Sequence, residues 1–94
     1  MKDFFIYILK CSDGSYYVGH TDDIDKRMSE HEQGFYEGYT SSRRPLSLVY
    51  LELIGSRDAA IESERKLKGW SRKKKELLIA KGWKGIKSCW RLLN

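Results

Sequence analysis

Two short apolar runs open the chain and predict a β-hairpin. The first, residues 4–9 (FFIYIL), is apolar at every position, and the second, residues 15–19 (SYYVG), follows a Ser-Asp-Gly turn. Apolar and aromatic runs of this length on either side of a glycine turn are typical of paired strands. Because neither face of the first run is polar, we expect the sheet to be covered on both sides.

The hydrophobic period then changes to that of a helix. Ile24, Met28 and His31 recur at helical spacing, and either Thr21 or Asp22 can cap the first turn. The polar positions between them fit the exposed side of an amphipathic helix. This segment therefore predicts the first helix of the fold.

The next segments predict a loop, a third strand and a second helix. The first helix should end near Gly34, and residues 34–45, with several aromatic and basic side chains, should form an ordered surface loop. Residues 46–53 predict the strand. Ser56 can cap a helix of about 14 residues that ends near Gly69.

The last third of the chain predicts further helix. Ser71 should start a helix that runs through Ala80. Residues 83–94 are too apolar for a free tail, and we expect them to pack as a short helix. The resulting order, ββαβαα, predicts an α/β (α+β) domain: a small three-stranded, mostly antiparallel sheet flanked by helices. Residues 1–94 are short enough to form one domain.

Charge adds a class of partner to this picture. The chain has 18 Lys and Arg against 13 Asp and Glu, which gives a net charge of +5. Such a balance favours polyanionic partners, nucleic acid first and an anionic membrane surface second. Cys11 and Cys89 lie too far apart for a zinc pair and are expected to be reduced thiols. The apolar run at residues 4–9 is too short to be a signal peptide or a membrane span, so we expect a cytoplasmic protein.

Three polar features fall where apolar side chains belong. Arg27 lies beside Met28 on the inward stripe of the first helix, where it could also extend past the edge of the core. Glu64 falls on the inner face of the second helix, where a salt bridge or a metal would explain it. The hairpin tyrosines, Tyr7, Tyr16 and Tyr17, could be ordinary packing. Together these residues could surround one end of the sheet.

On these residues the chain resembles the GIY-YIG nuclease domain, and specifically its small stand-alone members. Residues 5–7 (FIY) stand in place of the first motif and residues 17–19 (YVG) in place of the second. The resemblance covers about residues 4–80. Further matching positions, in chain order, are His20, Thr21, Arg27, Glu30, His31, Tyr39, Thr40, Arg43, Arg44, Pro45, Leu48, Val49, Tyr50, Ala60, Glu64, Lys68, Gly69, Trp70 and Ser71.

The resemblance implies a metal-dependent phosphodiesterase. Tyr17 would be the general base or would orient the attacking water, with support from Tyr7. Arg27 would neutralise phosphate charge, and His31 would bond the phosphate or the water shell of the metal. Glu64 would bind a single Mg²⁺ or Mn²⁺, an ion that needs few protein carboxylates. The guanidinium of an arginine suits the charge that gathers on phosphoryl oxygens.

Two positions depart from the family pattern. Phe5 replaces the glycine of the first motif, which we interpret as a packing change. His20 stands where some relatives carry lysine, and we expect it either to supply a cation to Tyr17 or to act as a neutral hydrogen-bonding or packing residue. A free phenol titrates near ~10, so a tyrosine base needs a cation nearby. An imidazole titrates near ~6.5, so such support should fade as the pH rises.

Two basic clusters could contact a phosphate backbone. One opens the third helix, where a solvated charged face is the alternative. The other lies in the loop, beside Tyr36 and Tyr39, which could stack on an unpaired base. The first cluster is Arg72, Lys73, Lys74 and Lys75, and the second is Arg43 and Arg44.

These features favour a monomeric endonuclease that acts on nucleic acid, DNA before RNA, in repair or processing. A protein partner could supply its specificity. The alternatives are a non-catalytic nucleic-acid-binding module and a small interaction protein whose tyrosines are core residues. If Tyr7 and Tyr17 serve one site, they must share a face of the sheet. Tyr7 should then oppose an odd-numbered residue, such as Gly19 across a three-residue loop.

Overall fold

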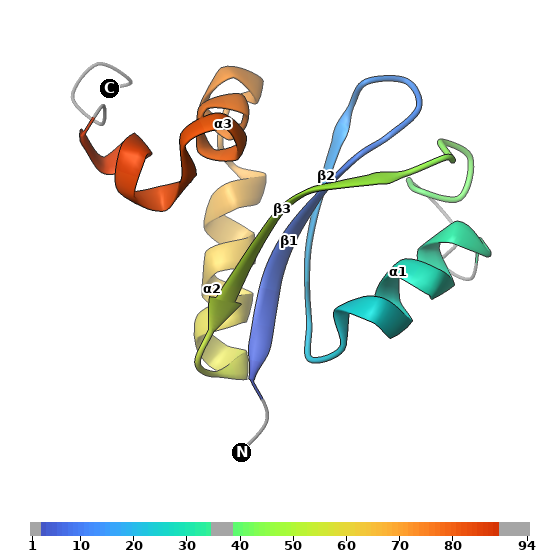
Figure 1. The fold of residues 1–94 in the computed structure, drawn as a ribbon, viewed down its shortest axis with the longest axis horizontal. Coiled ribbons are helices and arrows are strands. Elements are labelled where there is room, and N and C mark those ends of the chain that lie inside the picture. Colours follow the sequence, from blue (N-terminus) through green and yellow to red (C-terminus); the bar gives the residue numbers. More distant parts are fainter. Residues whose placement is uncertain (1–2, 35–38, 89–94) are drawn as a thin grey trace.

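The structure, a computed structural model, describes residues 3–34 and 39–88 (Figure 1). A three-stranded antiparallel sheet has the order β2-β1-β3, so the first strand is central. This confirms the predicted α+β class and the order ββαβαα. The elements are β1 (Phe4–Lys10), β2 (Tyr16–Thr21), α1 (Ile24–Glu32), β3 (Ser47–Ile54), α2 (Arg57–Lys68) and α3 (Arg72–Ser88).

The turn between β1 and β2 fixes the register of the hairpin. The amide of Cys11 donates to the carbonyl of Ser15 at 2.8 Å, and the amide of Gly14 donates to the carbonyl of Cys11 at 2.9 Å. Gly14 adopts a φ of 84°, which a three-residue hairpin loop requires at this position. Tyr7 consequently pairs with Gly19, as predicted, and Tyr7 and Tyr17 share a face of the sheet.

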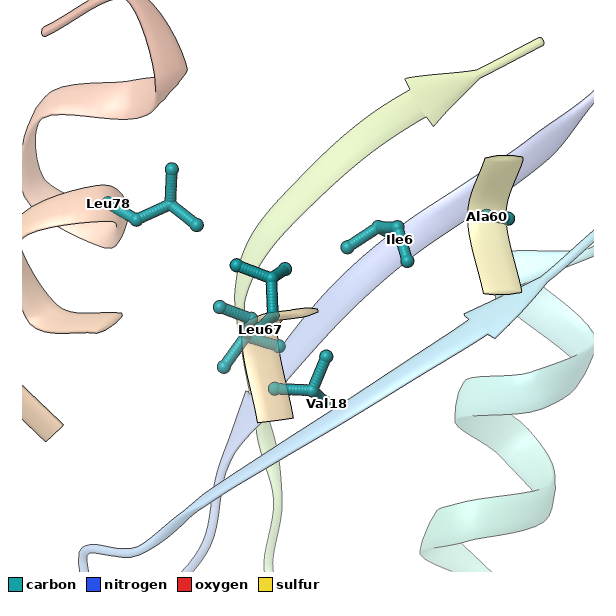
Figure 2. Packing of buried hydrophobic residues seen from close by; sticks show 6 residues of the cluster. Ile6, Val18, Ala60, Leu67 and Leu78 are labelled. Atoms are coloured by element: carbon teal, nitrogen blue, oxygen red, sulfur yellow. The ribbon is translucent and has the colours of Figure 1, made fainter. Parts of the chain in front are cut away.

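Each face of the sheet has its own apolar cluster. Ile6, Ile8 and Val18 pack against Ala60, Leu67 and Leu78 of the two C-terminal helices (Figure 2). On the other face, where Figure 1 shows α1, the cluster is formed by Leu9, Cys11 and Leu46, with Tyr17 and Met28 packed against it. The central strand is therefore buried on both sides, which explains why residues 4–9 contain no charged residue.

The expectation that the whole sheet is covered is wrong for β3. Leu48, Leu51 and Leu53 are 41%, 43% and 57% exposed. α1 has only nine residues, and its Met28 packs with Tyr17 toward the β2 side of that face. The outer strand therefore keeps one face open to solvent.

Helix α1 is capped by a different residue from those predicted. Asp23 is the N-cap, and its carboxylate accepts the amide of Lys26 at 3.1 Å. Thr21 ends β2, and its hydroxyl instead accepts the amide of Asp23 at 3.1 Å. Because Thr21 is still extended, it positions the cap rather than acting as one. Gly34 follows the helix with a φ of 76°, close to the predicted end.

The later boundaries lie close to their predicted positions. Ser56 caps α2, Gly69 ends it, and the Ser71 hydroxyl accepts the amide of Lys74 at 3.2 Å at the start of α3. Gly82, with a φ of 72°, interrupts α3 just beyond the predicted end, and helix resumes to residue 88. The rest of the predicted C-terminal helix, residues 89–94, lies outside the described residues. No helix in the described ranges is long and apolar enough to cross a membrane.

Candidate active site

Tyr7 lies completely buried in the centre of the sheet, directly across from Gly19. A Cβ atom on residue 19 would lie 2.5 Å from Cζ of Tyr7, well inside van der Waals contact. The ring therefore occupies the space that a side chain on residue 19 would fill. Glycine at the end of the second motif is a steric requirement of the tyrosine in the first.

A buried chain of hydrogen bonds holds the Tyr7 hydroxyl. Nε2 of His31 lies 3.0 Å from the Tyr7 oxygen, and Nδ1 of His31 lies 3.1 Å from Oγ1 of Thr40. Burial raises the pKa of Tyr7, and the neighbouring Tyr17 raises it further. Burial also lowers the pKa of His31, assisted by the charge of Arg27. The imidazole is therefore neutral, and one of its ring nitrogens donates a hydrogen bond while the other accepts one.

This arrangement corrects the role predicted for His31. The residue is only 1% exposed, and both of its ring nitrogens bond within the protein. A side chain so enclosed cannot also reach a phosphate or the water shell of a metal. Its contact with the Tyr7 hydroxyl would instead make His31 a positioning residue.

Arg27 reaches the same hydroxyl from the first helix. Its guanidinium lowers the pKa of Tyr7 through its charge and a hydrogen bond, against the larger effect of burial. Nε lies 3.9 Å from Oε1 of Glu30, and the side chain is 31% exposed. Arg27 thus lies between the buried phenol and solvent, where a planar cation could meet an incoming phosphate.

Tyr17 is the more accessible of the two motif tyrosines. Its ring is half-buried and makes edge-to-face contacts with Tyr7, at a centroid distance of 6.4 Å, and with His31, at 5.4 Å. Tyr39 stacks beside it at 6.4 Å. The phenol that could meet a water or a substrate is therefore Tyr17, and the buried Tyr7 supports it.

Glu64 lies at the edge of the sheet, on the face opposite the tyrosines. It falls between the buried residues Ala60 and Leu67 on α2, and its side chain is 20% exposed. Nδ1 of His20 lies 3.0 Å from Oε1 of Glu64, and Nζ of Lys68 lies 3.4 Å from Oε2. The inward position inferred from helical spacing is confirmed, and both carboxylate oxygens have partners.

The predicted partner of His20 needs correction. Residues 17 and 20 point to opposite faces of β2 because strand side chains alternate. His20 accordingly contacts Glu64 rather than supporting Tyr17. A cation does lie beside the Tyr17 ring, but it belongs to Lys68, whose Nζ is 6.0 Å from the ring centroid. Lys68 carried no predicted role, although its position one turn after Glu64 could have suggested one.

The two halves of the site meet around β2, which is an outer strand of the sheet. Lys68 extends from α2 to Tyr17 on the other face, and the charge of Glu64 contributes to the raised pKa of Tyr7. Gly19 adds no side chain between them. The edge of β2 thus gathers two phenols, a guanidinium, a carboxylate and two further basic groups.

The residues present fit a weakly held divalent ion. Within residues 3–34 and 39–88, no group of three or more His, Cys, Asp or Glu side chains could hold a metal. Mg²⁺ requires only one or two carboxylates and takes its other ligands from water and phosphate. Each carboxylate oxygen keeps a second lone pair, so Glu64 can bind an ion while His20 orients it.

The loop arginines are engaged in holding the loop. Nε of Arg43 donates to Asp13 at 2.9 Å, and its guanidinium lies 4.0 Å above the ring of Tyr39. Arg44 donates to the carbonyls of Ser41 at 3.0 Å and Glu32 at 2.9 Å, at the end of α1. Arg44 is exposed and has a structural role in the loop, and its contact with phosphate stays a prediction. Tyr36, predicted beside them, lies outside the described residues.

The basic cluster at the start of α3 is partly engaged as well. The guanidinium of Arg72 lies 4.9 Å above the Tyr16 ring, and Nζ of Lys74 lies 4.4 Å above Trp70. Lys73 is exposed and Lys75 is partly so. Tyr16 and His20 are four residues apart on β2, so this cluster lies about 13 Å along the strand from the Glu64 pair. That spacing suits contact with a phosphate backbone on one side of the site.

The chain is similar to known proteins over most of its length. Residues 3–77 match the family model of the GIY-YIG catalytic domain. A UPF0213 protein of Staphylococcus saprophyticus is 44% identical over 82 residues, which are 87% of this chain and 100% of the relative. A UPF0213 protein of Bacillus pumilus is 44% identical over 75 residues, 80% of this chain and 76% of the relative.

Two solution structures share the fold. The UPF0213 protein of Bacillus halodurans is 40% identical and superposes with a TM-score of 0.55 over 83% of each chain. A protein of E. faecalis is 36% identical, with a TM-score of 0.58 over 81% of each chain.

Proposed function

Because the chain belongs to the GIY-YIG family of nuclease domains, among the UPF0213 proteins, we propose that it is a metal-dependent endonuclease. Its reaction is the hydrolysis of a phosphodiester bond in nucleic acid, DNA in preference to RNA, during repair or processing. The observation that carries the proposal is Glu64, an inward carboxylate fixed by His20 at the strand edge that also bears Tyr17. A protein that only binds nucleic acid needs no metal ligand there.

Water activation falls to Tyr17. Tyr7 cannot take this role, because it is fully buried and its hydroxyl is committed to His31. The Tyr17 ring packs against both and is only half-buried, so Tyr17 is the motif tyrosine that solvent can reach. It orients the attacking water and accepts its proton. The bond from the water oxygen to phosphorus forms as the opposite bond, from phosphorus to the leaving oxygen, breaks, and the leaving oxygen takes a proton from solvent.

Arg27 and the carboxylate site stabilise the negative charge on the phosphate. Arg27 presents a partly exposed guanidinium beside Tyr7, where it can bond the nonbridging oxygens as charge gathers on them. A Mg²⁺ or Mn²⁺ ion bound at Glu64 would supply electrophilic stabilisation of the phosphate and the leaving oxygen. His20 keeps the carboxylate oriented toward that position.

The main alternative is a nucleic-acid-binding module without activity. The basic cluster on α3 suits either function, so it does not separate them. The two functions differ in what they require of Glu64, which only the enzyme needs as a ligand. A protein partner could direct either function to particular substrates, and we expect the enzyme itself to be monomeric.

A cleavage panel tests the proposal. Labelled single-stranded, duplex, branched and flapped DNA, with matching RNA, would be incubated with the protein and Mg²⁺ or Mn²⁺. We expect cleavage of at least one DNA substrate that EDTA abolishes. Tight binding to the panel without cleavage under any metal condition would favour the binding module instead.

A further inference from the structure

The two oxygens of Glu64 have partners of different mobility. Oε1 lies 3.0 Å from Nδ1 of His20, an imidazole held on the strand and 28% exposed. Oε2 lies 3.4 Å from Nζ of Lys68, whose side chain is 53% exposed. Exposed ion pairs one helical turn apart are weak, and the flexible four-carbon stem of lysine lets its ammonium group move. Oε2 is therefore the position that opens at low cost.

Lys68 also lies within reach of a second location. Its Nζ is 6.0 Å from the centroid of Tyr17, on the other side of the strand edge. A small movement of the ammonium away from Glu64 therefore keeps it beside the phenol that faces the substrate. His20 holds the carboxylate in place while this happens.

We propose that Lys68 is a resident cation that exchanges with the metal. It neutralises Glu64 in the metal-free protein and yields Oε2 when a divalent ion arrives. It then stays beside Tyr17, as a positive charge facing the scissile phosphate. This proposal rests on the metal-dependent nuclease function and adds to it a control of metal loading.

Removing Lys68 should change metal affinity in the direction opposite to removing a metal ligand. Lys68 competes with the ion for Oε2 and repels it, so its removal should tighten metal binding. It should also slow cleavage, because the phosphate loses a positive charge. A residue with only a structural role would not shift these two quantities in opposite directions.

The test compares Lys68→Met with Lys66→Met by titration calorimetry with Mn²⁺ alone. Lys66 is a matched control, since it pairs with Glu62 one turn earlier at 3.5 Å, on the same helix and away from Glu64. We expect Lys68→Met to bind Mn²⁺ about three- to tenfold more tightly than the wild type, and Lys66→Met to bind it as the wild type does. At saturating Mn²⁺, single-turnover cleavage should fall about tenfold or more in Lys68→Met, and Lys68→Arg should restore most of it.

Equal Mn²⁺ affinities for the two methionine variants would overturn the exchange, as would weaker binding by Lys68→Met or no detectable Mn²⁺ in any of the proteins. Thermal melting of each variant checks that it is folded. If the wild type cleaves no substrate, the nuclease function fails, whereas an affinity gain confined to Lys68→Met still supports the exchange at Glu64.

Discussion

The hydroxyl of Tyr7 lies 3.0 Å from Nε2 of His31, and this bond ties the first motif strand to the first helix. Both residues are buried, so the phenol and the imidazole satisfy each other where water is excluded. Thr40 completes the chain from the following loop. The site is thus positioned by a polar network inside the core, and its stability should depend on the protonation of His31.

Acid should destabilise the protein partly through His31. Its folded-state pKa is lowered, mainly by burial, whereas an unfolded imidazole titrates near ~6.5. Below that value the unfolded chain binds the extra proton first, so the free energy of unfolding falls as the pH drops toward the folded-state pKa. We expect urea denaturation from pH 7.5 to 5 to show a shallower loss for His31→Gln than for the wild type. Equal slopes would mean that His31 does not titrate on unfolding.

Replacing the motif glycine should disrupt Tyr7. In Gly19→Ala the new methyl group would overlap the Tyr7 ring, and overpacking of this kind costs about 1–3 kcal/mol. Cleavage should fall along with stability. Gly55→Ala is the control, because no atom lies within 4 Å of its Cβ position. Chemical denaturation measures the stability of the two variants. Similar stabilities would argue against the close approach of the Tyr7 ring to residue 19.

Loss of His20 should weaken the metal site. In His20→Ala, Glu64 keeps its charge but loses the group that orients Oε1. Partners of this kind typically contribute about 10- to 100-fold in metal affinity or activity. We expect weaker Mn²⁺ binding by calorimetry and slower cleavage, with nucleic-acid affinity preserved. Unchanged Mn²⁺ affinity would show that His20 does not orient the ligand.

The basic cluster on α3 should act on binding alone. Changing Lys73, Lys74 and Lys75 together to Ala should weaken nucleic-acid affinity. The slope of log affinity against log salt concentration should become shallower by up to ~0.9 per lost phosphate contact. Fluorescence anisotropy at several salt concentrations measures both. Arg44→Ala should instead lower stability, because Arg44 bonds two loop carbonyls. A larger affinity loss in Arg44→Ala than in the triple variant would reverse these assignments.

Periodicity and caps predicted most of the fold because they depend on local sequence. The strands, the turn at Gly14 and the Ser56 cap follow from short patterns that the structure reproduces. The inward position of Glu64 likewise follows from helical spacing. The bare face of β3 could not be predicted, because it depends on how much of the sheet a nine-residue helix covers.

The partners within the site were harder to predict than its members. His20 and Glu64 are 44 residues apart in the chain. A short local motif cannot pair residues that far apart. Strand alternation alone places the His20 and Tyr17 side chains on opposite faces of β2. The partner of His20, however, depends on how α2 crosses the sheet. The resemblance implies that His31 bonds the phosphate or the water shell of a metal, and it does not reveal that both ring nitrogens are bonded in the core. Such long-range contacts are set by packing.

We expect Glu64 to serve catalysis rather than the fold or the binding of nucleic acid. The most direct test is single-turnover cleavage by Glu64→Gln beside the wild type, with affinity for the same substrate measured by anisotropy. We predict that cleavage is abolished while affinity and thermal stability stay close to those of the wild type. Equal losses of cleavage and affinity, or cleavage at the wild-type rate, would show that Glu64 is not a catalytic metal ligand.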